Sequence, residues 1–267
     1  LHQHNVPPSI ALSVIKQAET RIMRKTRVSE NDVKILGLLS SSLRSEMRVS
    51  MFDRHIQSLP VLRFWAVTSS SFTRELCSGA VELLCLADAD DLFQATMTAS
   101  KAYYLVSGQL QYVQEPESAK VDDVTTTRVY PNSWLCEAAL WTEWTHVGTA
   151  EALKECELME LDATGLIHTV LRHRLIRELA VSYGCAFHQQ LITAGNQPTD
   201  LCVPNTAWTE IVPELPSDVQ KFIGLSVIHK DVVAPHLQAV LLELEDQVNQ
   251  GRCALVRDSD GEVKRFV

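Results

Sequence analysis

The residues best suited to chemistry lie in one short stretch, residues 130–150. Glu137 stands there among small and apolar neighbours, and His146 follows nine positions later. A carboxylate can accept hydrogen bonds from a sugar hydroxyl, and an imidazole can donate one to an anion. A Pro-Asn-Ser turn signal opens the stretch, and a short turn of helix after it would present free backbone N–H groups, which bind anions. The stretch therefore predicts a site for a small anionic molecule that carries hydroxyl groups.

The stretch resembles the phosphate-binding cassette of the cyclic-nucleotide-binding domain family. That cassette reads roughly Phe-Gly-Glu-x-Ala-Leu, a short loop, and Arg-x-Ala-Thr-Val. The positions that correspond to it here are Cys136, Glu137, Ala138, Ala139, His146, Val147, Gly148 and Thr149. Glu137 keeps the ribose-binding position, whereas Cys136 replaces the glycine and His146 replaces the phosphate-binding arginine. The resemblance implies cAMP or cGMP as the candidate ligand, bound by these eight residues, and no other cofactor.

These replacements leave three interpretations of the pocket open. Arginine offers a phosphate a permanently charged fork, so its exchange for His146 predicts binding that is weaker by at least a few kcal/mol. Alternatively, Trp134, Trp141 and Trp144 fill the pocket from inside, and Glu137 is a structural carboxylate. A third interpretation is an unrelated ligand held by His146 and the aromatic rings. The common nucleophile, P-loop and metalloprotease motifs do not occur, so we expect no enzyme.

The sequence around the cassette predicts an α+β fold. In the resembled family, residues 66–191 would form an antiparallel β-roll, and the last helix would be a lid over the base. The predicted elements are a helix and strand at 66–86, a strand–turn–strand at 102–113 around Gly108, a polar loop at 114–128, further strands to Leu161, and helices to Leu191.

Residues 1–65 predict three short helices, the last of which Pro60 would end. Leu43-Arg44-Ser45-Glu46-Met47 and the segment from Pro60 to Phe64 resemble the C-linker of voltage-gated and cyclic-nucleotide-regulated cation channels. The combined resemblance covers about residues 5–190. It implies the cytoplasmic gating region of a voltage-gated, potassium-type or cyclic-nucleotide-regulated cation channel, with the other subunits of a homotetramer as partners. The alternative is a soluble cyclic-nucleotide-binding regulator that resembles a kinase regulatory subunit.

Residues 192–217 contain four prolines and predict a linker. Residues 218–267 predict a C-terminal extension of two helices and a β-hairpin that resembles no family we recognise. The chain begins at Leu1, not at methionine, and ends on a strand-like segment, which suggests a piece of a longer protein.

The net charge of −9 is unevenly distributed. Up to Trp65 the chain has ten Lys/Arg and five Asp/Glu, whereas the remainder has fourteen and twenty-eight. The basic stretch from Lys16 to Arg27 predicts contact with anionic lipid, with calmodulin or with a neighbouring subunit. The acidic tail argues against a nucleic-acid partner, because duplex binding needs a basic face. Seven cysteines without a C-x-x-C pair, and histidines without ligand spacing, predict free thiols and no metal.

Overall fold

We describe a computed structural model of the chain. It describes residues 38–194, 198–231, 254–257 and 263–266, and six single positions (7, 10, 12, 15, 248 and 250). Most of the first two helices expected in residues 1–39, and the helical pattern from Leu237 onwards, lie outside the described residues. No helix in the described part of the chain is long and apolar enough to cross a membrane.

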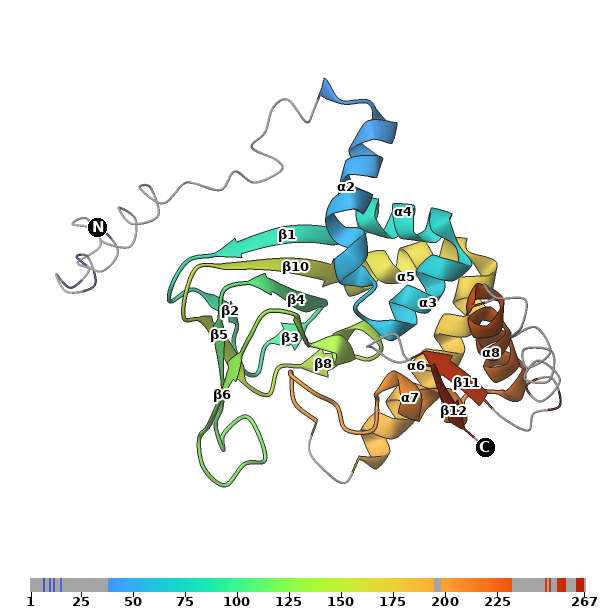
Figure 1. Ribbon diagram of the computed structural model, residues 1–267. Coiled ribbons are helices and arrows are strands. Elements are labelled where there is room, and N and C mark those ends of the chain that lie inside the picture. The colour runs from blue at the N-terminus through green and yellow to red at the C-terminus, as the bar shows by residue number, and fades with distance from the viewer. Residues whose placement is uncertain are drawn as a thin grey trace.

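Two four-stranded antiparallel sheets form the roll (Figure 1). One has the strand order β1-β10-β4-β7, the other has the order β2-β9-β5-β6, and β3 pairs with β8 in a short third sheet. The bounds are β1 Val81–Leu86, β2 Asp91–Phe93, β3 Thr98–Ala99, β4 Lys101–Ser107, β5 Leu110–Gln114, β6 Thr125–Val129, β7 Ser133–Leu135, β8 Trp144–Thr145, β9 Thr149–Ala152 and β10 Cys156–Asp162. The antiparallel roll with flanking helices that the sequence predicts is confirmed.

Two details of the predicted strands need correction. The strand–turn–strand predicted around Gly108 is confirmed, but its strands do not pair with each other as in the hairpin of the resembled family: β4 pairs with β10 and β7, while β5 pairs with β9 and β6. Gly108 has φ +99°, and an added Cβ would lie 2.5 Å from the carbonyl oxygen of Glu155, so the chain can turn sharply there from one sheet into the other. The expected loop at 114–128 also ends in β6, which is mostly exposed and lies at a sheet edge.

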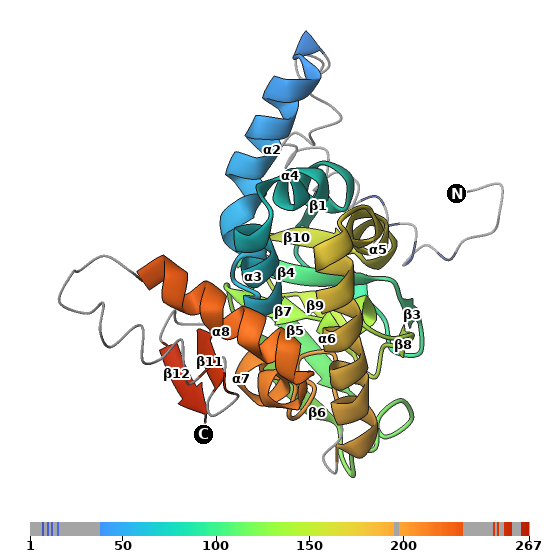
Figure 2. The ribbon, with the colours of Figure 1, turned by 90° about the vertical axis from the view of Figure 1, so that its right-hand side faces the viewer.

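In the described part of the chain, three helices precede the roll and two follow it directly (Figures 1 and 2). They are α2 Ser41–Ile56, α3 Pro60–Thr68, α4 Ser70–Gly79, α5 Ala163–Arg172 and α6 Arg174–Thr193. Ser40, Ser69 and Asp162 cap α2, α4 and α5, each by accepting a backbone N–H with its side chain. Pro60 does not end a long helix as expected. It occupies the first turn of α3, where its missing N–H costs nothing, and α2 has already ended at Ile56.

The helices α2, α3 and α4 pack directly on the roll. Arg48 of α2 donates to the carbonyl oxygens of Cys77, at 2.8 Å, and of Val81. The indole N–H of Trp134 in β7 donates to Ser58 at 2.8 Å, between α2 and α3. One continuous core of buried side chains runs from the helices into both sheets. The region before the roll is therefore part of the same packed body.

Residues 198–217, which were expected to be a linker, also pack into this body. They contain α7 (Trp208–Ile211) and the 3-10 turn η5 (Val212–Glu214), and α8 (Ser217–Asp231) follows. Trp208, Ile211 and Val212 are buried. The predicted terminal hairpin is confirmed, because β11 (Ala254–Arg257) pairs antiparallel with β12 (Val263–Phe266). In Figure 2, α8 crosses in front of this pair, and the long α6 runs down beside the roll.

Candidate functional site

The cassette keeps the backbone shape that its sequence predicts. β7 leads into a 3-10 turn, η4 (Glu137–Leu140), and Cys136 between them has φ +60°. This left-handed conformation suits glycine and strains a residue with a Cβ atom. Cys136 therefore stands at the position of the family's glycine and adopts the backbone that a glycine would adopt there.

A residue that the sequence did not single out occupies the centre of the site. Asp200 is 2% exposed, and its carboxylate accepts five hydrogen bonds from oxygen and nitrogen donors. The donors are the Tyr112 hydroxyl, the Trp144 indole, Nδ1 of His146 and the backbone N–H groups of Val147 and Gly148, at 2.8, 2.8, 2.8, 2.9 and 3.1 Å. Because a carboxylate only accepts, Nδ1 of His146 carries the hydrogen of its bond.

The backbone of the same residue completes the contact. The Cys136 N–H donates to the Asp200 carbonyl oxygen at 2.6 Å, and the Asp200 N–H donates to the Tyr112 hydroxyl at 3.3 Å. Burial alone would raise the pKa of Asp200, but the hydrogen bonds from His146, Trp144 and Tyr112 outweigh it and hold this pKa below its usual value. We call residues 198–206 the Asp200 segment. It places an ionised carboxylate among the groups that the cassette would offer to a phosphate.

His146 is fixed through both its ring and its backbone. Its ring, which is 4% exposed, stacks on Phe93 with centroids 4.0 Å apart and planes 6° apart. Its backbone N–H donates to Met97 at 2.9 Å, and its carbonyl oxygen accepts from Thr96 at 2.8 Å. The Cys136 sulfur lies 3.5 Å from Nδ1. His146 therefore directs its ring at Asp200 in a fixed orientation.

Of the other predicted site residues, Val147 and Gly148 contact Asp200, whereas Ala138, Ala139 and Thr149 have other partners. Val147 and Gly148 direct their backbone N–H groups to Asp200. Ala138 and Ala139 are buried in η4, where the Ala139 N–H donates to the Cys136 carbonyl at 3.0 Å and so closes the turn. Thr149 accepts a hydrogen bond from the backbone N–H of Ala95 at 3.1 Å, outside the Asp200 contact.

Glu137, which the resemblance aligns with a ribose-binding residue, lies beside α6. Its Oε1 is 3.5 Å from the Tyr183 hydroxyl of α6 and 3.4 Å from the Trp141 indole nitrogen, both long for hydrogen bonds. Burial raises the pKa of Glu137 to about 7, against the smaller lowering effect of these two donors. The carboxylate is therefore poorly compensated in its charged form.

We expect Glu137→Gln to raise the free energy of unfolding at pH 8 by about 1–3 kcal/mol. A carboxyl whose pKa is higher in the folded state destabilises the fold progressively as pH rises from its unfolded value of 4.5 to about 7, and fully above that. The amide cannot ionise, so the variant should gain little at pH 4.5. Urea unfolding at both pH values measures this, with the exposed Glu143→Gln as control. An equal effect at both pH values would contradict the assigned pKa.

The three tryptophans of the cassette have separate roles. Trp134 reaches outward to Ser58, and Trp144 donates to Asp200. Trp141 contacts Tyr183 of α6 with ring centroids 4.8 Å apart, and lies 5.9 Å from Trp65 of α3. Only Trp144 thus contacts the residue at the centre of the site, so the alternative of a pocket filled by tryptophans applies to its edge and not to its centre.

Gly148 allows Tyr112 to reach Asp200. A Cβ atom at Gly148 would lie 2.5 Å from the Tyr112 ring, whereas one at Gly184 in α6 would meet nothing closer than 4.0 Å. We expect Gly148→Ala to lower the free energy of unfolding by about 1–3 kcal/mol through overpacking. Gly184→Ala should raise it by about 0.5–1 kcal/mol, because alanine favours a helix. Urea unfolding of both variants tests the pair, and an unchanged or higher stability of Gly148→Ala would contradict the close approach.

The sequence carries no signal that would have identified Asp200. It follows Pro198 and Thr199 in a polar segment, and the Thr199 hydroxyl accepts from the N–H groups of Leu201 and Cys202 at 3.2 and 3.0 Å. This local turn is typical of a surface loop. The burial of Asp200 depends on partners 52–88 positions earlier in the chain, which no local pattern reveals.

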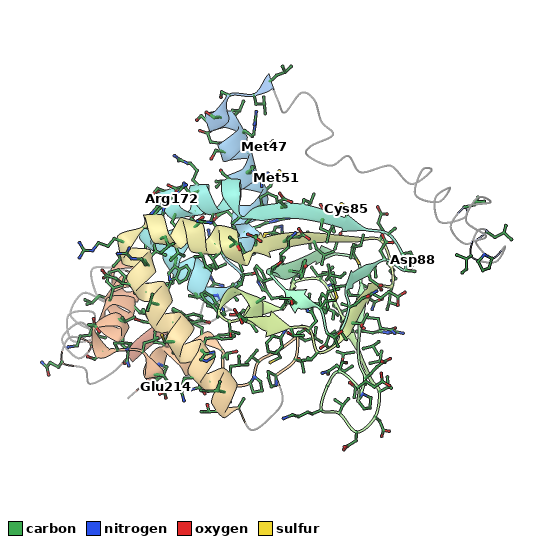
Figure 3. All side chains as sticks on the ribbon, turned by 180° about the vertical axis from the view of Figure 1, so that it is seen from behind. Met47, Met51, Cys85, Asp88, Arg172 and Glu214 are labelled. Atoms are coloured by element: carbon green, nitrogen blue, oxygen red, sulfur yellow. The ribbon has the colours of Figure 1, made fainter. Side chains whose placement is uncertain are left out.

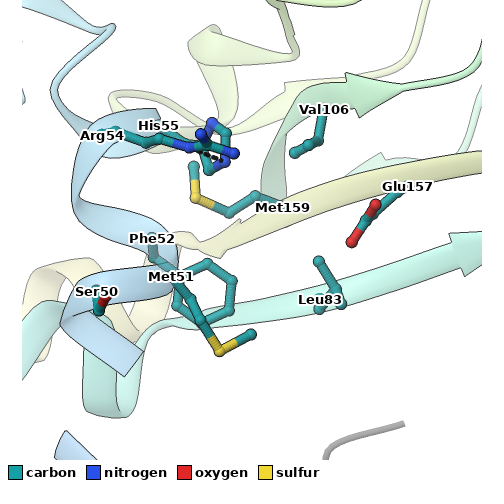
Figure 4. A pocket seen from close by; sticks show the side chains of 9 residues that line it. All are labelled: Ser50, Met51, Phe52, Arg54, His55, Leu83, Val106, Glu157 and Met159. Atoms are coloured by element: carbon teal, nitrogen blue, oxygen red, sulfur yellow. Dashed lines mark hydrogen bonds between the residues drawn. The ribbon is translucent and has the colours of Figure 1, made fainter. Parts of the chain in front are cut away.

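A separate pocket of about 420 Å³ lies between α2 and the outer face of the first sheet (Figure 4). It is lined by Ser50, Met51, Phe52, Arg54, His55, Leu83, Val106, Glu157 and Met159. Met51 continues a row with Met47 along α2 (Figure 3) and is 38% exposed. The pocket shares no lining residue with the cassette, so we treat it as a distinct surface feature.

The chain has limited similarity to known proteins. No family model and no curated protein matches it. Among solved structures, a cyclic nucleotide-binding-like protein from Brucella abortus is similar to part of it, with 25% sequence identity and a TM-score of 0.37. The match covers 44% of this chain and 97% of that chain.

Proposed function

We propose that this chain carries a regulatory module of the cyclic-nucleotide-binding type whose pocket is occupied by its own Asp200 segment. The module then acts by packing and assembly, without a nucleotide. The observation that supports this most is the Asp200 carboxylate, which takes the N–H groups of Val147 and Gly148 and the imidazole of His146. These belong to the cassette half that resembles the phosphate-binding segment.

A nucleotide would have to expel Asp200 before it could bind. A cyclic phosphate and a carboxylate are both anions, and two like charges in one buried site repel each other strongly. The carboxylate is also part of the same chain, so it competes at a high effective concentration that dilution does not lower. The apparent affinity of any nucleotide equals its intrinsic affinity multiplied by the fraction of molecules in which Asp200 has left the site.

The helices before the roll extend this proposal. Their resemblance to a C-linker suggests the non-enzymatic, cytoplasmic gating region of a voltage-gated, potassium-type cation channel that assembles with other copies of its subunit. The hydrogen bonds of Arg48 to Cys77 and Val81 support a mechanical role, since movement of α2 is transmitted to the start of the roll. A soluble regulator similar to a kinase regulatory subunit is the alternative, and it would have the same pocket. The two differ in whether pore helices precede Leu1 in the full protein.

Calorimetric titration with cAMP and cGMP tests the pocket. We expect no saturable binding by the wild-type chain. His146→Arg alone should not bind either, because the new guanidinium would pair with Asp200. The double variant His146→Arg/Asp200→Asn should bind, since it restores the phosphate partner and removes the competing charge. Far-UV circular dichroism shows that each variant is folded.

Micromolar binding by the wild-type chain would overturn the proposal. Binding by His146→Arg but not by the wild-type chain would show that the missing arginine, and not Asp200, keeps the nucleotide out. A folded double variant without binding would also count against a pocket that needs only these two changes.

A further inference from the structure

Three potential metal ligands meet in the interior. The Cys136 sulfur lies 3.5 Å from Nδ1 of His146 and 3.7 Å from Oδ1 of Asp200, and the last two atoms are 2.8 Å apart. All three residues are buried, and they come from three separate segments of the chain. A sulfur, an imidazole nitrogen and a carboxylate oxygen are the donor types that zinc binds.

We propose that Cys136, His146 and Asp200 bind a Zn²⁺ ion that fastens the Asp200 segment to the roll. Tetrahedral zinc with bonds of about 2.3 Å to sulfur and about 2.0 Å to nitrogen and oxygen places sulfur about 3.5 Å from either of the other ligands. The two observed sulfur separations agree with this. Nitrogen and oxygen would move apart by about 0.5 Å from the distance that their hydrogen bond now sets.

The charges balance when the metal replaces hydrogen. The thiol proton of Cys136 leaves to solvent, and the proton on Nδ1 of His146 moves to Nε2, so that sulfur and Nδ1 each present a free electron pair to the Zn²⁺ ion. A thiolate and the Asp200 carboxylate together neutralise the two charges of the ion, while the imidazole stays neutral. The occupied site therefore carries no net charge, which avoids the large cost of an unpaired charge in the interior.

The surrounding contacts already orient the ligands. The Trp144 indole donates to the ligating Oδ1 of Asp200 at 2.8 Å, and the Tyr112 hydroxyl donates to Oδ2 at 2.8 Å. The His146 ring is fixed by its stack on Phe93. Such outer partners set the orientation and the affinity of metal ligands. Within the described residues no fourth side chain joins the set, so a small exogenous ligand would complete the coordination.

A hydrogen-bonding role alone does not account for Cys136. A thiol is a weak donor, and its 3.7 Å contact adds little to a carboxylate that already has five stronger partners. The residue also adopts a left-handed backbone that glycine would adopt without strain. A role as a sulfur ligand of a metal explains why a cysteine is present despite its weak hydrogen bond and its strained backbone. The inference rests on the proposed function in one respect, because Asp200 must lie in the pocket.

The test uses Zn²⁺ and Co²⁺ as probes on the purified chain. We expect one equivalent of tightly bound zinc by elemental analysis, and a sulfur-to-cobalt charge-transfer band in the near ultraviolet after exchange. Cys136→Ser and Cys136→Gly should lose both, and glycine keeps the turn unstrained. Cys185→Ser, which removes an exposed thiol on α6, should retain both. Hydrogen exchange of residues 198–206 shows independently whether the segment stays docked.

Each outcome separates the two proposals. A folded wild-type chain with a protected Asp200 segment and no stoichiometric zinc would overturn the metal site and leave the occupied pocket standing. A cobalt band that survives in Cys136→Gly would overturn the metal site as well. Rapid exchange of the segment both without zinc and with zinc added in excess would overturn both proposals.

Discussion

Asp200→Ala is expected to lower the free energy of unfolding by about 3–5 kcal/mol, the range found when one partner of a buried charged network is removed. Three side chains and two backbone N–H groups lose their acceptor at once. Each buried donor left without a partner costs about 1–3 kcal/mol, and hydrogen bonds to water that enters the cavity reduce this cost. Urea unfolding with a chelator present measures this contribution apart from any metal.

Asp88→Ala is the matched control. Asp88 lies exposed at the turn between β1 and β2 (Figure 3), so its loss should change stability by no more than about 0.5 kcal/mol. A similar small effect of Asp200→Ala would mean that the carboxylate is not the acceptor of this network. Reduced protection of residues 198–206 in the variant would show that the segment leaves the roll when its charge is removed.

Trp65→Ala should lower the free energy of unfolding by about 3–5 kcal/mol, as aromatic truncations in cores do. Trp65 is 1% exposed and meets Phe72 of α4 and Trp141 of the cassette edge-on, with centroids 5.7 and 5.9 Å away. The variant leaves a cavity where three elements meet. Thermal or urea unfolding measures the loss.

Val67→Ala on the same helix provides the control, because Val67 is 40% exposed. It should alter stability by about 0.5 kcal/mol or less. If Trp65→Ala unfolds α3 in a separate, earlier transition while the roll remains intact, the helices before the roll are not part of one cooperative unit. A single transition for both variants agrees with the continuous core.

Local patterns predicted the elements that hold the cassette. The apolar residues Leu158, Met159 and Leu161 indicated β10, and the predicted helices after it correspond to α5 and α6. These features depend on neighbours within a few residues, which is the range over which a sequence pattern carries information.

Features set by distant contacts could not be predicted. Prolines in residues 192–217 indicated a linker, yet Trp208 is buried. Its ring packs against Phe64 and Tyr183, which lie earlier in the chain. The turn at Gly108 was recognised, but the partners of β4 are β7 and β10 and those of β5 are β6 and β9, all later in the chain, so they gave no local signal. The centre of the site, Asp200, belongs to this class.

The packing of Trp208 links the pocket to the helices before the roll. Its ring lies 5.9 Å from Phe64 of α3 and 5.7 Å from Tyr183 of α6, and Asp200 stands eight positions before it. If the residues between Asp200 and Trp208 transmit the movement, release of Asp200 shifts a contact that α3 and α6 share. Coupling free energies are reciprocal. If release of Asp200 favours a shifted position of α3, then shifting α3 weakens the binding of Asp200 in the pocket by the same free energy. Under the proposed function, the pocket would then report tension in the helices without a diffusible messenger.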